Sequence, residues 1–320
     1  MNRNGFEGTK PSFTSELANP SVGPLYSASP RLAVQVGDRC DVPPEFRSAF
    51  GAVNDAHGPL EVAFFLPAMV RPSKSGTVLI PQRMACIFRE HFALLSVTAD
   101  AGRTAIRVVG RSQLLGYGLG GFLLDCWITL YHSGTPREIQ IQFPVQSGDL
   151  FAVFVNALFH INEDEGGKRQ PSAAHSVIPL NCPAQFSHFL HAHPELGEMH
   201  NCFLQTPVPF GKARRQKCAH LLISRTEDGL IALTDEDPPG SSWLGLRLTY
   251  LLLGSVMYAE WRDQFHLQQG VLFLHVGARE QSLRLEWSIA MRFREAAMEW
   301  IEGLNSALHR RAPKAQLSSM

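Results

Sequence analysis

Short apolar runs recur about every ten residues through much of the first half of the chain. Turn-forming Gly, Pro and Asp residues separate these runs, which are Val62–Leu66, Val78–Ile80, Cys86–Phe88, Phe92–Val97 and Ile106–Val109. Evenly spaced runs of this kind are typical of the strands of an all-β barrel or sandwich. Upstream of them, Pro43 and Pro44 predict the start of a short helix that ends near Gly58.

Each half of the chain closes with an alternating strand and then a helix. Alternating apolar and polar residues predict two strands that each have one solvent-exposed face. The apolar positions are Ile139, Ile141 and Phe143 in the first strand, and Leu285, Trp287 and Ile289 in the second. An apolar stripe at helical spacing follows each strand and predicts an amphipathic helix. The stripes are Leu150, Phe151, Phe154, Leu158 and Ile161, and then Phe293, Ala297, Trp300, Ile301, Leu304 and Leu308.

Matching positions in the two halves keep a nearly constant separation. Phe154 and Trp300 are 146 residues apart, whereas Phe65 and Phe203, nearer the start of each half, are 138 apart. The difference of 8 residues fits loop insertions, so the sequence predicts a duplicated domain. The predicted division is a tail with a short helix (1–59), a first domain (60–165), a linker (166–197), a second domain (198–310) and a C-terminal tail (311–320).

The order of these elements resembles a known superfold. In the second half, Cys218–Arg225, a short turn and Gly229–Asp235 look like an early hairpin, and Ala297–Leu304 looks like a closing helix. The Gly-rich segment Leu114–Leu124 resembles a hairpin at the corresponding place in the first half. Short strands closed by one amphipathic helix resemble the tandem pleckstrin-homology (PH-like) domains of bacteria. The resemblance implies a mostly β, α+β fold of two PH-like barrels, each capped by a C-terminal helix.

Composition narrows the classes of function. Lys and Arg (29) balance Asp and Glu (29), so the chain has no overall charge that would attract nucleic acid or an anionic membrane. No apolar run approaches the roughly 18 residues of a membrane helix, and the polar N-terminus lacks the apolar core of a secretory signal. Six cysteines without a CxxC pair do not form a disulfide framework, so we expect a cytoplasmic protein.

One basic cluster is a candidate binding site for an anionic ligand. Lys212, Arg214, Arg215 and Lys217 lie within six residues, between two predicted strands. The PH-like resemblance implies that this loop holds anionic headgroups in some members, and several cations on one loop can clamp a phosphate through charge-assisted hydrogen bonds. The alternative interpretation is a solvated basic loop, which is the usual role of a short charge run.

Two further motifs have simpler structural explanations. Gly116, Gly118 and Gly121 match the spacing of the dinucleotide fingerprint, but the segment after them predicts a strand where that motif needs a helix. We therefore interpret them as hairpin glycines. A cluster of residue types that zinc prefers consists of His188, His191, His193 and His200, with Cys182 and Cys202 beside them. Its unpaired spacing favours a His-rich linker, although the sequence leaves metal binding open.

The sequence offers little support for catalysis. It contains no GxSxG, HExxH or P-loop motif. Cys218 and His220 alternate on a predicted strand, but no third group in the sequence is identified that would orient the histidine. We therefore predict a non-catalytic tandem PH-like scaffold, without cofactor or metal, that binds a protein or peptide at a strand edge. The alternative is an anionic-ligand binder, for a phospholipid headgroup or a nucleotide, that uses the 212–217 loop.

Overall fold

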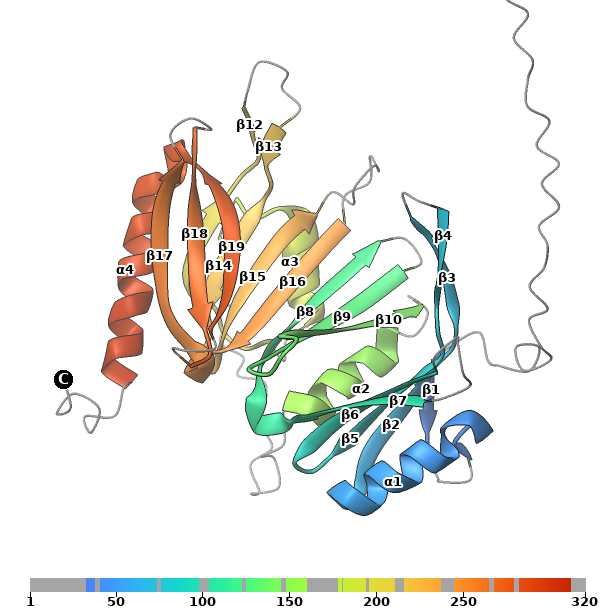
Figure 1. The fold of residues 1–320 in the computed structure, drawn as a ribbon. Helices are drawn as coiled ribbons and strands as arrows, with labels where there is room; N and C mark the ends of the chain where they lie inside the picture. Colours follow the sequence, from blue (N-terminus) through green and yellow to red (C-terminus); the bar gives the residue numbers. More distant parts are fainter. Residues whose placement is uncertain are drawn as a thin grey trace, which may run out of the picture.

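The computed structural model describes most of the chain after residue 32. The described residues are 33–37, 41–73, 76–97, 104–122, 125–144, 148–159, 178–179, 181–193, 196–210, 216–236, 245–264, 268–278 and 282–311. Within them the fold is mostly β, with antiparallel sheets and four α-helices (Figure 1). No helix among these residues is long and apolar enough to cross a membrane. The predicted α+β composition is therefore confirmed.

The two halves of the chain contain the same series of elements. The first half consists of β2 (Leu60–Leu66), β3 (Met69–Ser73), β4 (Gly76–Ile80), β5 (Arg83–Phe88), β6 (His91–Val97), β7 (Thr104–Gly110), the 3-10 turn η4 (Arg111–Gln113), β8 (Leu114–Phe122), β9 (Asp125–His132), β10 (Glu138–Pro144) and α2 (Gly148–Phe159). The second half consists of β11 (His200–Gln205), β12 (Val208–Phe210), β13 (Gln216–Cys218), β14 (Leu221–Arg225), β15 (Gly229–Glu236), β16 (Gly245–Leu252), the 3-10 turn η8 (Leu253–Ser255), β17 (Val256–Gln264), β18 (Gln269–Val276), β19 (Leu283–Ala290) and α4 (Arg294–Arg311).

Strand order is also the same in both halves. The strands β2-β5-β6-β7 of the first half correspond to β11-β14-β15-β16 of the second, and β8-β9-β10 correspond to β17-β18-β19. A separate two-stranded hairpin, β3-β4 or β12-β13, follows the first strand of each half. Different strand orders would have ruled out a duplication, so the shared order is the outcome that a duplicated domain predicts.

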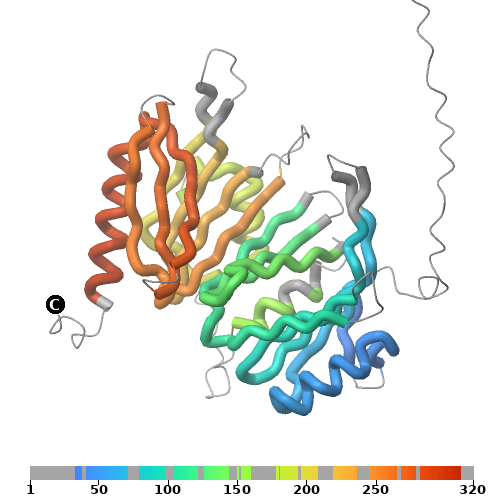
Figure 2. The backbone as a smooth tube through the Cα atoms, viewed as in Figure 1, coloured from blue at the N-terminus to red at the C-terminus, as the bar shows by residue number. Residues whose placement is uncertain are grey.

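The sheets are open, and the two closed barrels expected from the sequence are not seen among the described residues. A 3-10 turn redirects the chain between β7 and β8 in the first half, and between β16 and β17 in the second. The two strands on either side of each turn do not pair with each other. Instead, β8 of the first half pairs with β16 of the second. This pairing creates one seven-stranded sheet, β10-β9-β8-β16-β15-β14-β11, that runs through both halves (Figure 2).

A helix precedes each half and covers one face of its first sheet. The helix α1 (Arg47–His57), preceded by the 3-10 turn η3 (Pro44–Phe46), packs Phe50 onto the first sheet, which β1 (Val34–Val36) extends at the edge of β2. The helix α3 (Ala184–Ala192) packs Phe186 and Leu190 onto the second. The predicted linker, 166–197, therefore contains a helix, which is short and buries two apolar residues, Phe186 and Leu190.

The closing helices carry large buried aromatic side chains. Phe154 of α2 packs edge-on against Phe64 and Phe92, with ring centroids 5.7 and 5.9 Å away. Trp300 of α4 is 3% exposed, and its indole N–H donates to the carbonyl of Asn201 at 2.6 Å. The prediction that these two positions lie in the core is therefore confirmed.

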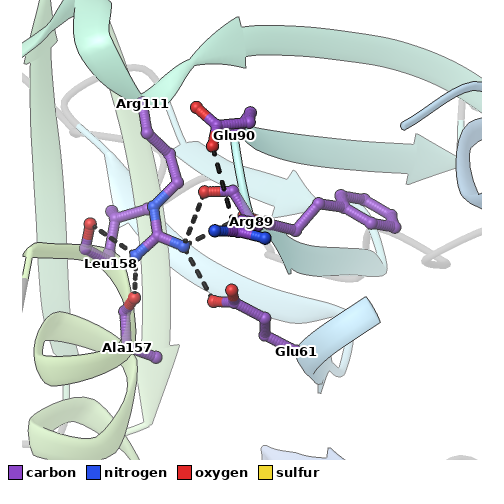
Figure 3. Close-up of polar contacts among 7 residues, drawn as sticks. Glu61, Arg89, Glu90, Arg111, Ala157 and Leu158 are labelled. Carbon is purple, nitrogen blue, oxygen red and sulfur yellow. Dashed lines mark hydrogen bonds and ion pairs between the residues drawn. The ribbon is translucent and has the colours of Figure 1, made fainter. Parts of the chain in front are cut away.

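The helix α2 is held by an arginine that the hydrophobic pattern does not reveal. Arg111 of η4 has a side chain only 3% exposed and pairs with Glu61 at 2.8 Å. Its guanidinium also donates to the carbonyls of Ala157 and Leu158 on α2 (Figure 3). Further donations reach the carbonyls of Phe88, at the end of β5, and of Arg89, in the turn to β6. One side chain thus joins α2 to the first sheet.

Candidate functional site

The junction between β8 and β16 shows how one strand edge of this protein accepts another strand. The two strands are antiparallel, and Tyr117 of β8 lies opposite Tyr250 of β16. The two tyrosine rings stack with their centroids 5.2 Å apart. Since directly opposite side chains are the stabilising unit of a sheet, this pair contributes to the attachment of the two halves.

The glycines of β8 allow close approach of its neighbours. A Cβ on Gly116, whose φ is +154°, would lie 2.2 Å from the carbonyl oxygen of Tyr250. A Cβ on Gly118 would lie 2.8 Å from the Tyr131 hydroxyl. Because β9 follows these glycines directly, the interpretation of this segment as strand is confirmed and the helix required by a dinucleotide fingerprint is absent here.

Contacts outside the strand pair also join the two halves. The Ser255 hydroxyl donates to the carbonyl of Leu115 at 2.9 Å. The Arg137 guanidinium donates to the carbonyl of Ser282, which connects the β9–β10 turn to the segment before β19. Apolar residues of both halves also share one core cluster. The junction is therefore a packed interface with more than a single strand pair.

The strand of the first half that corresponds to β16 is β7, and its outer edge is unpaired among the described residues. In the sheet order, β7 is the last strand and pairs with β6 alone. Ile106 and Val108 of β7 are 45% and 37% exposed. The residues at the same places in β16, Leu248 and Tyr250, are 1% and 8% exposed. Equivalent apolar positions are thus buried at one edge and open to solvent at the other.

The edge of β17, which corresponds to β8, is already occupied by the protein's own helix. Figure 1 shows α4 lying along β17. The Asn305 side chain of α4 accepts a hydrogen bond from the Ala259 N–H at 2.9 Å and donates one to the Ala259 carbonyl at 3.0 Å. Such side-chain pairing protects a strand edge from other chains. The exposed edge of β7 is accordingly the candidate interaction surface.

Replacing Asn305 with alanine tests this protection. We expect the free energy of unfolding to fall by about 1–3 kcal/mol, because two backbone groups of Ala259 lose their partner. Urea denaturation followed by circular dichroism measures the change. Ser306→Ala, at the exposed neighbouring position, is the matched control and should leave stability nearly unchanged. An Asn305→Ala variant as stable as the control would contradict this role.

The basic cluster predicted from the sequence lies mostly outside the described residues. Lys212, Arg214 and Arg215 belong to that part of the chain, and only the backbone of Lys217, on β13, is described. Lys217 lies on β13 opposite Pro209 of β12, and the other three residues lie between these two paired strands in the chain. Its role in binding an anion stays a prediction.

The histidine cluster is distributed over a helix and a strand. His188 and His191 are exposed on α3, His193 follows its last turn with its ring 4.3 Å from Phe189, and His200 begins β11. No group of three or more metal-ligating side chains is found in the part of the chain that the structure describes. Burial raises the pKa of the Cys202 thiol, which disfavours the thiolate that zinc needs.

A polar pair beneath α3 was missed by the sequence analysis. The Nδ1 atom of His220 lies 2.7 Å from Asp235 Oδ2, and the Asp235 side chain is 7% exposed. No group that orients His220 was predicted from the sequence, and the structure corrects this: the pairing of β14 with β15 brings Asp235 beside it. The His220 ring also contacts Phe186 edge-on, and phenylalanine is not a nucleophile. The Cys218 side chain lies outside the described residues.

A cavity within the first half is apolar and small. It has a volume of about 30 Å³, and Phe64, Ile128 and Phe154 are among its apolar lining residues. Ligand sites are typically about 300–1,000 Å³. This cavity is therefore too small for a metabolite.

Comparison with known proteins does not assign the chain to a family. No protein-family model matches the sequence, and no curated protein matches it.

Proposed function

We propose that this chain is a non-catalytic scaffold of two PH-like domains and that its first half binds a partner protein by strand addition at β7. The observation that carries the proposal is the difference between two equivalent edges. The edge of β16 is filled by β8, whereas β7 presents Ile106 and Val108 to solvent. A sheet edge with unpaired backbone groups and apolar side chains is a template for an added strand.

The element order supports the PH-like part of the proposal. Each half has four strands of one sheet, then three strands of another, then a closing helix with a buried aromatic residue. This order is what the sequence resemblance implies. PH-like folds host several functions, so the fold alone does not select one. The exposed edge favours protein binding over the other functions.

The non-catalytic part rests on the contacts of the described residues. Among the described side chains, His220 contacts Asp235 and Phe186, and neither is a nucleophile that the histidine could activate. The apolar cavity of the first half is too small to hold a substrate.

The double variant Ile106→Lys/Val108→Lys tests the binding edge. Lysine on an exposed edge strand disfavours pairing with another chain. We expect a partner that co-purifies with the tagged full-length protein to be reduced at least about tenfold, which corresponds to 1.4 kcal/mol. Quantitative mass spectrometry of the purified material measures the loss. Thermal unfolding should change little, because both side chains are already solvent-exposed.

Val34→Lys is the matched control for this experiment. Val34 is 44% exposed on β1, at the opposite edge of the same five-stranded sheet. It introduces one lysine at similar exposure on an edge strand but leaves β7 unchanged. Retention of the partner by the double variant, or an equal loss in both variants, would show that β7 is not the binding edge.

A further inference from the structure

The pairing of β8 with β16 shows what kind of strand the edge of β16 accepts. Large apolar residues of β8, Tyr117 and Leu119, lie opposite Tyr250 and Leu248 of β16. The position opposite Leu251 is Gly116, where a Cβ would lie 2.2 Å from the carbonyl oxygen of Tyr250. The accepted strand therefore combines large apolar side chains on one face with a glycine where the two backbones approach closely.

The same register can be transferred to β7. The strands β7 and β16 are each followed directly by a 3-10 turn, and each is the last of the four strands that its half contributes to its first sheet, β2-β5-β6-β7 and β11-β14-β15-β16. Ile106 and Val108 therefore take the places of Leu248 and Tyr250. A strand added to β7 in this register would place large apolar side chains opposite both residues and a glycine opposite Val109.

The other face of β7 carries a positive charge at Arg107. Arg107 is exposed and stands between Ile106 and Val108. Burial, together with the positive charge of Arg107, lowers the pKa of both Arg83 and His132, so Arg107 repels each of these two groups when it is charged. A carboxylate opposite Arg107 would relieve this repulsion, whereas a second copy paired through β7 would bring another Arg107 to the same edge.

Resting on the proposed function, we infer that the strand bound by β7 comes from a different protein and has a defined pattern. It carries large apolar side chains opposite Ile106 and Val108, a glycine opposite Val109 and an acidic side chain opposite Arg107. Apolar contacts supply most of the affinity, and the charge pair fixes the register.

Peptides based on β8 test this pattern on the full-length protein. The first probe is the segment Leu114–Phe122, carried on a polyethylene glycol linker for solubility, and the second is the same peptide with Gly118→Asp. Position 118 is the one that faces Arg107 after transfer of the register. Fluorescence anisotropy should show that the Gly118→Asp peptide binds about two- to fivefold more tightly than the first probe. This advantage should disappear in Arg107→Gln and shrink as salt increases.

Two controls separate sequence-specific strand pairing from nonspecific apolar binding of the peptides. A Gly116→Val peptide should bind at least about tenfold more weakly, because its side chain meets the facing backbone. Ile106→Lys/Val108→Lys should lose the first two peptides, whereas Val34→Lys should keep them.

The possible results distinguish this inference from the proposed function. If neither peptide binds, or if Gly118→Asp gives no advantage over the unmodified peptide, the inferred pattern is wrong. Should the co-purifying partner still depend on Ile106 and Val108, the proposed function stands without that pattern. A dimer of this chain that is abolished by Ile106→Lys/Val108→Lys would also overturn the inference, because the occupant would then be a second copy.

Discussion

Replacing Trp300 with alanine is expected to lower the free energy of unfolding by about 3–5 kcal/mol. The indole is 3% exposed in the core of the second half, where it packs among residues of α4 and both sheets. Truncation removes this apolar contact and leaves a cavity. It also removes the donor for the Asn201 carbonyl, which the indole N–H contacts at 2.6 Å. Urea denaturation with circular dichroism detection measures the loss.

Two companion variants separate these contributions. Trp300→Phe keeps much of the apolar contact but lacks the N–H, so it should cost less than the alanine variant. Glu299→Ala, at the exposed neighbouring position on α4, should leave stability within about 0.5 kcal/mol of the wild type. If Trp300→Ala unfolds at the same urea concentration as Glu299→Ala, the packing of α4 through Trp300 does not stabilise the second core.

Local patterns predicted most of the secondary structure. The strands around Phe65 and Phe203, and the helices around Phe154 and Trp300, lie where periodicity placed them. The separation between matching elements grows from 138 to 146 residues through longer connections after β15, β17 and β18. These features depend on neighbouring residues, so a single sequence contains the information needed to predict them.

The candidate interaction surface could not be predicted in the same way. The pairing of β8 with β16 joins segments about 130 residues apart, and an alternating strand pattern does not specify its partner. Ile106 in β7 and Leu248 in β16 have the same character in sequence, yet only one is buried. The protection of β17 depends on Asn305, a polar residue beside an apolar stripe that has no distinctive local signal.

Buried polar groups have no local sequence pattern from which they could be predicted. Arg111 looks like a surface residue, and nothing near it in the chain predicts its contact with the backbone of α2. The corresponding residue of the second half is Leu253, which is 3% exposed in the second core. The surroundings of the two residues explain the difference. Arg111 donates to the backbone carbonyls of Ala157 and Leu158, whereas Leu253 packs among the apolar side chains of the second core.

These surroundings decide which residue is needed at the two positions. In the first half, the Arg111 guanidinium donates to the carbonyls of Ala157 and Leu158 on α2 and to a carbonyl of β5. The corresponding carbonyls of Gly303 and Leu304 lie inside α4 and bond to its following turn. A leucine therefore suffices at 253, whereas the first half uses a donor at 111.

Arg111→Leu is therefore expected to lower the free energy of unfolding by about 3–5 kcal/mol, although leucine is the native residue at the equivalent position. The variant leaves the carbonyls of α2 and of the β5–β6 turn buried without their donor. Arg89→Leu is the matched control, because Arg89 is 81% exposed and its ion pair with Glu90, at 3.9 Å, contributes little. Urea denaturation gives the stability difference, and hydrogen exchange should show faster exchange around Ala157 and Leu158 of α2. Equal stability of Arg111→Leu and Arg89→Leu would mean that α2 packs stably without this arginine.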